Sequence, residues 1–292
     1  HCRLWDSRGI ELWVKRDDLA HTIVSGNKIR KLAYLIRRLQ EGACNGVVSF
    51  GGPYSNHLHA LAWVCRQYNV PFIAFVRSHS PEVDKRNSAT IGDMVDWGTE
   101  IRFLSPHDYR QKRDLHLNSR WQRDFPGWTI VPEGGSSPEA LPGIAEMVTE
   151  VYDKIANPHL WICPVGTGAT LAGMIRAVRQ DQHVLGISAI KSSVLDIDLR
   201  HRWKLEECSN WTLAQQWHFG GYGRTTKPLL SFINDFARRY SIRLDPLYNG
   251  KAMFSFCQYV EYGLIPPGSR VVFVHTGGLQ GWRGIPNPNL SE

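Results

Sequence analysis

Short apolar runs alternate with longer segments of helical periodicity along most of the chain. The apolar runs predict β-strands at 46–50, 71–76, 100–104, 128–131, 160–165, 184–187 and 270–275. The helical spacing predicts α-helices at 28–40, 55–68, 82–97, 138–155, 170–180, 227–240 and 250–262. Strands that are apolar throughout and alternate with helices predict an α/β fold, with parallel sheets covered by helices on both faces. Ligands of such folds bind beyond the carboxyl ends of the strands.

Two segments do not follow this alternation. Residues 105–127 are polar and rich in Arg, Trp and His, which predicts a helix plus a surface loop. Residues 198–226 contain Trp203, Trp211, Trp217 and Tyr222, and this composition favours a folded lid or the wall of a pocket.

The composition is that of an ordinary soluble enzyme, but the charge is basic. Of the 292 residues, 42% are hydrophobic and 21% are charged, and the formal net charge is +7 with a pI near 9.2. A basic chain invites a nucleic-acid interpretation. Here the basic residues are scattered, so we expect no nucleic-acid partner, and the positive field suits an anionic substrate or a phosphorylated cofactor equally well.

The cysteines argue against both a metal site and a disulfide framework. Six cysteines are spread singly, without a C-x-x-C pair. Free thiols in a reducing cytoplasm are the simplest interpretation. No apolar stretch is long enough to span a membrane, and no signal-peptide pattern opens the chain, whose first residue is not methionine and looks trimmed. We therefore expect a cytoplasmic protein without membrane contact or bound metal, with a monovalent cation left open.

Lys28 is the leading candidate for covalent chemistry. It lies behind Gly26 and Asn27, at the start of the predicted helix 28–40. A single lysine is more often a solvated surface cation. A functional role for Lys28 is favoured here because several polar or glycine-rich turns each follow an apolar run, and a parallel sheet would bring such turns together.

One of these turns has the features of a phosphate site. It directly follows the predicted strand 160–165 and opens the next helix, with the residues Gly166, Thr167, Gly168, Ala169 and Thr170. Such a turn offers unpaired backbone N–H groups and a helix dipole to one phosphate. It is not a Walker loop and fits the dinucleotide fingerprint poorly. The alternative is a tight turn that merely needs small residues.

Three further turns carry polar side chains. In Gly51-Gly-Pro-Tyr-Ser55-Asn56-His57, Ser55 can cap the following helix, while Asn56 and His57 could reach a ring hydroxyl or a carboxylate. Capping alone would also explain the serine. The other two turns are Leu244-Asp-Pro-Leu-Tyr248-Asn249-Gly250-Lys251 and His275-Thr276-Gly277-Gly278, which have plain explanations as turn punctuation.

Taken in order, these motifs resemble a known enzyme family. The chain resembles the type II fold of pyridoxal-phosphate enzymes, which is tryptophan synthase β-like, and within it the 1-aminocyclopropane-1-carboxylate deaminase and D-cysteine desulfhydrase family. The matching pieces span nearly the whole chain and also include Lys15-Arg-Asp-Asp18, Arg30-Lys31-Leu32, Pro132-Glu-Gly-Gly135 and Gly221-Tyr-Gly223.

The resemblance implies a role for each candidate residue. It implies that Lys28 carries pyridoxal 5'-phosphate covalently, that Asn56 contacts the ring hydroxyl, and that residues 166–170 cradle the phosphate. Once a substrate displaces Lys28, its freed amine can act as the base at Cα. Ser55 and Tyr248 would hold the substrate carboxylate or assist at the reacting carbon. The remaining implied contacts are His57 to the substrate, and Asn249 and Thr276 to the cofactor.

The resemblance also implies a domain organisation and an assembly. A large cofactor-binding domain would comprise residues 1–30 and 134–292, with a small α/β domain at 31–133 inserted after the start of the lysine helix. The expected assembly is a homodimer.

Two departures from the family pattern bear on the substrate. Asn249 stands where the cyclopropane deaminases have Glu and the desulfhydrases usually have Thr, and Thr276 stands where those deaminases have Leu. Both positions argue against opening of the cyclopropane ring, and Thr276 matches the desulfhydrases, whereas Asn249 matches neither pattern. The expected activity is that of a D-cysteine desulfhydrase, which gives pyruvate, ammonia and sulfide from a small amino acid. The alternatives are 1-aminocyclopropane-1-carboxylate deaminase, which gives 2-oxobutanoate, and a non-catalytic homologue that senses a ligand.

Overall fold

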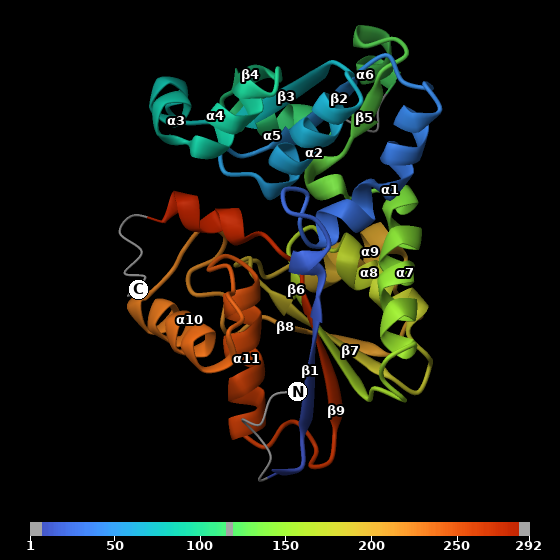
Figure 1. The fold of residues 1–292 in the computed structure, drawn as a ribbon, viewed down its shortest axis with the longest axis vertical. Helices are drawn as coiled ribbons and strands as arrows, with labels where there is room; N and C mark the ends of the chain where they lie inside the picture. Colours follow the sequence, from blue (N-terminus) through green and yellow to red (C-terminus); the bar gives the residue numbers. More distant parts are fainter. Residues whose placement is uncertain (1–7, 115–118, 286–292) are drawn as a thin grey trace.

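The larger of two sheets combines the two ends of the chain. The computed structural model describes residues 8–114 and 119–285. Within these ranges a five-stranded sheet, parallel throughout, has the order β1 (Glu11–Arg16), β9 (Arg270–His275), β6 (Leu160–Val165), β7 (His183–Ser188) and β8 (Trp211–Ala214). Strand β1 therefore pairs with the last strand of the chain, as the adjacent blue and red arrows of Figure 1 show.

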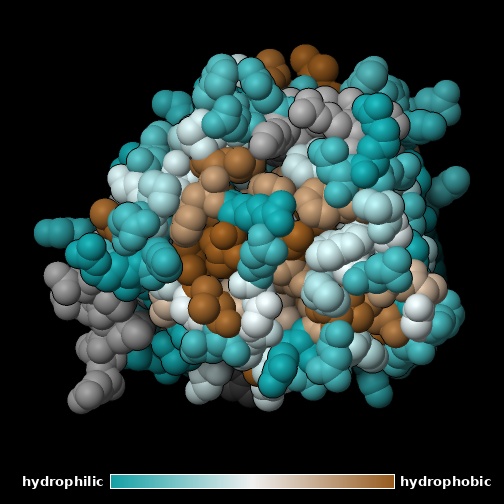
Figure 2. Space-filling view, turned by 90° about the horizontal axis from the view of Figure 1, so that it is seen from above, coloured by the Kyte–Doolittle hydropathy of each residue, from teal (hydrophilic) through white to brown (hydrophobic). Residues whose placement is uncertain are grey.

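The smaller sheet is formed by the middle of the first half of the chain. Its four parallel strands have the order β4 (Glu100–Leu104), β3 (Phe72–Arg77), β2 (Val47–Gly51) and β5 (Thr129–Val131). In Figure 1 this sheet and its helices lie above the larger sheet. Figure 2 looks down on this part of the molecule and shows hydrophobic residues gathered toward the middle of a largely hydrophilic face.

Helices cover both faces of the larger sheet. One hydrophobic core contains Trp161 and Cys163 of β6 with helices α7 (Leu141–Tyr152), α8 (Ala169–Ala177) and α9 (Leu195–Trp203). The alternate residue Ile162 points to a second core with α10 (Lys227–Tyr240) and α11 (Asn249–Glu261). Successive strand residues face opposite sides, so a strand that is apolar throughout serves both cores.

The smaller sheet is covered in the same way. One core joins it to α1 (Asn27–Gln40), α2 (Asn56–Gln67) and α4 (Ala89–Asp96). The other contains residues of α5 (Pro106–Asp114) and α6 (Ser119–Asp124). The remaining short elements are α3 (Pro81–Asn87), η2 (Asp17–Leu19), η3 (Glu133–Gly135), η4 (Pro138–Ala140) and η5 (Leu279–Gly284). None of the helices in the described ranges has the length and apolar character needed to cross a membrane.

The predicted fold class is confirmed, with three local differences. Every predicted strand is present, with each end within one residue of the prediction. Strand β1 escaped prediction because it ends in the charged residues Lys15 and Arg16, and β8 because it lies within the aromatic-rich segment 198–226, which also forms α9. The helix predicted at 82–97 is broken at Ser88, whose hydroxyl caps α4 by accepting a hydrogen bond from the backbone N–H of Ile91 (3.2 Å).

Some predictions fall outside the described residues. Helices α5 and α6 account for parts of 105–127, but the connection at 115–118 lies outside the described ranges. So do residues 1–7, with Cys2 and the unusual first residue. The larger sheet draws its strands from 11–16 and 160–275, and the smaller from 47–131. The predicted domain boundaries stay a prediction.

Helices α1 and α7 approach closely at Gly143. A β-carbon at this position would lie 2.1 Å from the backbone oxygen of Arg30. We predict that Gly143→Ala lowers the free energy of unfolding by about 1–3 kcal/mol, because the backbone of α1 must shift. Urea denaturation measures this change.

Gly92 provides the matched control, since it is exposed on α4 with open space around it. Gly92→Ala should raise the free energy of unfolding by about 0.5–1 kcal/mol, the usual gain for alanine over glycine in a helix. If Gly143→Ala matched Gly92→Ala, the close contact between α1 and α7 would be refuted.

Candidate functional site

Lys28 is the second residue of α1 and lines a cavity of about 460 Å³ that opens between α2, α4 and η5. Its Nζ donates a hydrogen bond to Asn27 Oδ1 at 2.6 Å. Burial lowers the pKa of Lys28 to about 8, while the attraction of Asp245 opposes the decrease. A substantial fraction of the amine is therefore neutral near physiological pH, as a nucleophile or a base requires.

The start of α1 is tied to two of the predicted turns. The backbone N–H of Asn27 donates to the Thr276 oxygen (3.2 Å), and Asn27 Nδ2 donates to Thr170 Oγ1 (2.8 Å). Gly26 has a φ of 69°, and a β-carbon there would lie 1.9 Å from the Thr276 oxygen. Only glycine fits this approach, so the glycine before the lysine keeps Lys28 beside the end of β9.

The turn 166–170 joins β6 to α8 as predicted. Gly168 has a φ of 89°, and a β-carbon there would lie 2.2 Å from Leu199 Cδ2, so this position also requires glycine. Thr167 Oγ1 and Ser136 Oγ share a hydrogen bond. A β-carbon at Gly166 would lie 3.1 Å from Tyr248 Cε1, so the tyrosine ring packs over the opening of the turn.

A buried lysine lies beside this turn. Lys31, one helical turn after Lys28, is buried and its Nζ donates to the Gly134 oxygen at 3.2 Å. Burial, together with the charges of Lys28 and Arg202, holds the pKa of Lys31 well below its ordinary value. A β-carbon at Gly134 would lie 2.9 Å from Thr167 Oγ1, so the amine of Lys31 belongs to the surroundings of the turn. An anion bound there would favour the protonated amine and offset the cost of burying its charge.

The Ser-Asn-His turn lies at the start of α2. Ser55 caps the helix by accepting from the backbone N–H of Leu58 at 3.2 Å, so its hydroxyl proton stays available to a ligand. Asn56 Oδ1 is buried and has no hydrogen-bond partner among the described residues. His57 shares a hydrogen bond with Ser49 Oγ (2.8 Å), and burial keeps its pKa well below the ordinary value, so the imidazole is neutral.

Tyr248 immediately precedes α11 and faces a second tyrosine. The centroids of the Tyr248 and Tyr222 rings are 5.9 Å apart. Burial raises the pKa of Tyr248 well above its ordinary value, so its hydroxyl stays protonated and can donate. The side chain of Tyr222 is 45% exposed and so can be reached by a small molecule.

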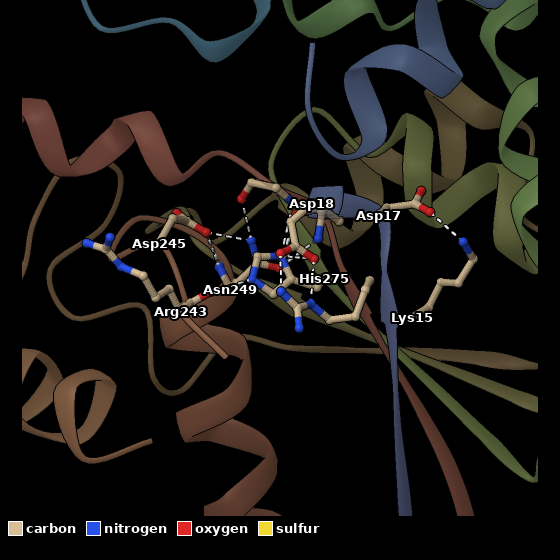
Figure 3. Close-up of polar contacts among 10 residues, drawn as sticks. Lys15, Asp17, Asp18, Arg243, Asp245, Asn249 and His275 are labelled. Carbon is tan, nitrogen blue, oxygen red and sulfur yellow. Dashed lines mark hydrogen bonds and ion pairs between the residues drawn. The ribbon is translucent and has the colours of Figure 1, made fainter. Parts of the chain in front are cut away.

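The side chain of Asn249 is held on every side by the protein (Figure 3). Its Nδ2 donates to Asp245 Oδ2 and to the Gly277 oxygen (2.8 Å), and its Oδ1 accepts from the backbone N–H of Thr276 at 2.9 Å. Asp245 is fully buried and also accepts the backbone N–H groups of Leu247, Tyr248 and Asn249, at 2.8–2.9 Å. Asn249 thus presents a neutral amide whose hydrogen-bonding groups are already used.

A family model described as "Pyridoxal-phosphate dependent enzyme" matches residues 3–277. The chain belongs to this family. The resemblance of the motifs to this family is therefore confirmed, and so is the cofactor that its name states.

Several relatives are similar over nearly the full chain. A Thermotoga maritima protein with the provisional name 1-aminocyclopropane-1-carboxylate deaminase is 27% identical over 300 residues, which cover 96% of this chain and 92% of that protein. An Arabidopsis thaliana protein named bifunctional D-cysteine desulfhydrase/1-aminocyclopropane-1-carboxylate deaminase, mitochondrial, is 25% identical, with 94% and 73% covered. The solved structure of an "ACC deaminase homologue" superposes with a TM-score of 0.80 at 25% identity, covering 94% of this chain and 87% of that one.

More distant structures share the fold alone. A threonine deaminase from Solanum lycopersicum superposes with a TM-score of 0.69 at 17% identity, covering 94% of this chain and 81% of that one. Together with the two parallel sheets, these likenesses confirm the predicted type II fold of pyridoxal-phosphate enzymes.

The residues present fit the cofactor of the family. Asn56 Oδ1 is a buried acceptor without a protein partner, as a ring hydroxyl would need. The turn 166–170 offers backbone N–H groups at the start of α8, and Lys31 adds a buried cation. Lys28 supplies an amine with a lowered pKa. These residues would hold the phosphate, the ring hydroxyl and the aldehyde carbon of pyridoxal phosphate.

Sequence reasoning gave no role to Lys31, and it gave Tyr222 only a place in a lid or pocket wall. Both lie in motifs of the family, but the sequence could not show that Lys31 is buried or that Tyr222 faces Tyr248. The signal for Lys31 was its position three residues after Lys28, on the same helical face as the core residue Leu35. The roles predicted for the other site residues stay predictions, although the hydrogen bonds of Asn249 leave it no spare donor for a cofactor ring.

A cluster of charges fixes the first turn of α1 to α7. Arg30 donates to both carboxylate oxygens of Glu150 and, at 3.1–3.2 Å, to both oxygens of Asp17. Lys15 lies 2.7 Å from Asp17, a contact drawn in Figure 3, and 2.8 Å from Glu150. These contacts hold Arg30, and with it the lysine two residues earlier, in place.

We predict an acid-dependent contribution of Glu150 to stability. Hydrogen bonds from Arg30, ahead of those from Lys15, lower the pKa of Glu150 from 4.5 to about 2. Because the folded state binds the proton more weakly, the contribution is complete above pH 4.5 and is lost as the pH falls toward 2. Glu150→Gln should therefore be less stable than the native protein at neutral pH, with a difference that shrinks across this range in urea denaturation.

Glu146→Gln is the matched control, since Glu146 is exposed one turn earlier on α7 and lies 3.8 Å from Arg37. We expect this variant to resemble the native protein, as exposed ion pairs contribute little. A constant Glu150→Gln difference from neutral pH down to pH 2 would contradict the prediction.

Proposed function

We propose that the protein is a pyridoxal-phosphate-dependent lyase that removes the β-substituent of D-cysteine or a related small β-substituted D-amino acid. With D-cysteine and water, the products are pyruvate, ammonia and sulfide. The observation that carries the proposal is the neutral amide of Asn249, held by Asp245, Gly277 and Thr276, where the cyclopropane deaminases have an acid.

The described residues suit the steps of such a reaction. The bound cofactor withdraws electrons from the substrate's Cα–H bond and stabilises the resulting carbanion. The amine of Lys28, whose pKa is about 8, removes the Cα proton. The hydroxyl of Ser55 and the amide of Asn56 bind the substrate carboxylate, with the neutral imidazole of His57 beside them. Tyr248 keeps its proton at neutral pH and can donate it to the departing sulfur.

A second candidate is deamination of 1-aminocyclopropane-1-carboxylate to 2-oxobutanoate and ammonia. The names of the relatives from Thermotoga maritima and Arabidopsis thaliana support it. Against it, an amide at position 249 cannot stabilise a protonated pyridine ring by charge, and Thr276 replaces the leucine of those deaminases. A third, weaker candidate is a non-catalytic protein that binds the cofactor or an amino acid as a sensor.

A product screen separates these candidates. We expect the protein loaded with pyridoxal phosphate to release sulfide and pyruvate from D-cysteine, and Lys28→Ala to reduce the rate by about a thousandfold or more, in line with the loss of a positioned base. L-cysteine, D-serine and the cyclopropane amino acid are assayed in parallel. Production of 2-oxobutanoate without sulfide would establish the second candidate. If no substrate gave a product, the non-catalytic sensor would be the remaining candidate.

Binding measurements test the phosphate site independently of turnover. We predict that Lys31→Met weakens binding of pyridoxal phosphate by about tenfold or more, because a buried charge-assisted hydrogen bond to the phosphate is lost. Binding of pyridoxal, which has no phosphate, should change little. Fluorescence titration with both ligands measures the two affinities, and equal losses for both would exclude a phosphate role for Lys31.

The cellular setting stays part of the proposal. We infer a cytoplasmic homodimer acting on a small amino acid, with no nucleic-acid partner. The scattered basic residues support the last point. Sedimentation of the loaded protein tests the dimer, and failure to bind oligonucleotides at physiological salt tests the last point.

A further inference from the structure

The segment that carries Tyr222 to the site has an unusual backbone. Between β8 and α10, residues 217–223 form turns rather than a helix or strand. Phe219, Gly220, Gly221 and Gly223 have φ angles of 52°, 89°, 104° and 73°. The segment makes hydrogen bonds of its own, from the Gly221 N–H to the His218 oxygen (3.0 Å) and from the Arg224 N–H to the Gly221 oxygen (3.2 Å). Such isolated turns open easily, so contacts from neighbouring elements also bear on where Tyr222 lies.

Helix α11 supplies those contacts along one of its faces. The rings of Phe219 and Phe254 lie 5.0 Å apart, and those of Trp217 and Tyr259 lie 5.6 Å apart. Aromatic contacts hold rings at a distance but leave the peptide planes between them free to rotate. They do not by themselves orient Tyr222 toward Tyr248.

Lys251 adds a shorter, charged contact to the Gly221 oxygen, which also accepts the Arg224 N–H. Its side chain is fully buried on α11, three residues after Tyr248, and its Nζ donates to the Gly221 oxygen at 2.7 Å. Burial lowers the pKa of Lys251 to about 8, and the attraction of Asp245 opposes the decrease. A buried cation is costly to keep. This one is placed on the carbonyl of the peptide bond that enters Tyr222.

We propose that Lys251 is a positioning residue, whose ammonium fixes the Gly221–Tyr222 peptide plane and thereby holds the Tyr222 ring against Tyr248. The peptide unit is planar, so fixing its oxygen also sets the direction in which the chain enters Tyr222. Lys251 is the third residue of α11 and Tyr248 is the residue directly before this helix, so only two residues separate them in the chain. The catalytic consequence rests on the proposed function, in which Tyr248 faces the substrate.

Hydrogen exchange of the protein tests the structural half without any substrate. In Lys251→Met, which keeps an unbranched side chain one atom shorter but removes its donor, amide exchange in residues 218–224 should be about tenfold faster or more. Lys251→Gln, which keeps an N–H donor without the charge, should show a smaller increase. Ser255→Ala is the control on the same helix: the Ser255 hydroxyl donates to the backbone oxygen of Lys251, so its loss leaves the Lys251 ammonium and the Gly221 oxygen in place, and native exchange in residues 218–224 is expected.

Unchanged exchange in Lys251→Met would overturn the proposal. If that variant does not fold, Lys251→Gln decides the question, because native exchange in residues 218–224 of Lys251→Gln would overturn it equally.

A double-mutant cycle tests the catalytic half. In the loaded enzyme, Lys251→Met should lower kcat on the best substrate about tenfold while the affinity for pyridoxal phosphate stays native. In a Tyr222→Ala background, the same change should cost nothing further, because its effect passes through Tyr222. Additive losses would refute action through Tyr222.

The two proposals can fail separately. Faster exchange in a protein that turns over none of the substrates removes the proposed function and leaves the positioning role. If the protein turns over a substrate but Lys251→Met leaves the amide exchange unchanged, the proposed function stands and the positioning role is removed.

Discussion

The buried carboxylate of Asp245 organises the site. It accepts the backbone N–H groups that lead into α11, holds the amide of Asn249, and favours the protonated forms of the two buried lysines, Lys28 and Lys251. A fully buried carboxylate is tolerated only when several donors satisfy it. Because those donors come from one helix start, the same interaction that stabilises the carboxylate also sets where Tyr248 lies before α11 and how Asn249 meets the turn after β9.

The site is strongly positive for its degree of burial. Burial, Lys28 and Arg202 all lower the pKa of Lys31. A phosphate bound beside Lys31 would relieve this repulsion and act as a counterion. Some of the basic residues of the chain therefore lie close together in the fold, although the lysines and arginines are scattered along the sequence.

The apolar strands, the helix at Lys28 and the four turns could be predicted, because burial on both faces and helical periodicity leave direct marks in the sequence. Strand β1 could not, since its charged end becomes favourable only through acids on η2 and α7. The same holds for the site. The motif residues could be identified, but the burial of Lys31, the engaged amide of Asn249 and the bond from Lys251 to Gly221 depend on contacts between distant segments.

Helix α1 joins the two sheets in a particular way. Its first turn is bound to the end of β9, to Thr170 and to α7, whereas Leu35 and Leu39 belong to the core of the smaller sheet. A rigid rod fixed at one end pivots about that end. A rotation of the smaller sheet about the start of α1 would therefore change the width of the cavity, which α2 and α4 line, and would displace Lys28 little.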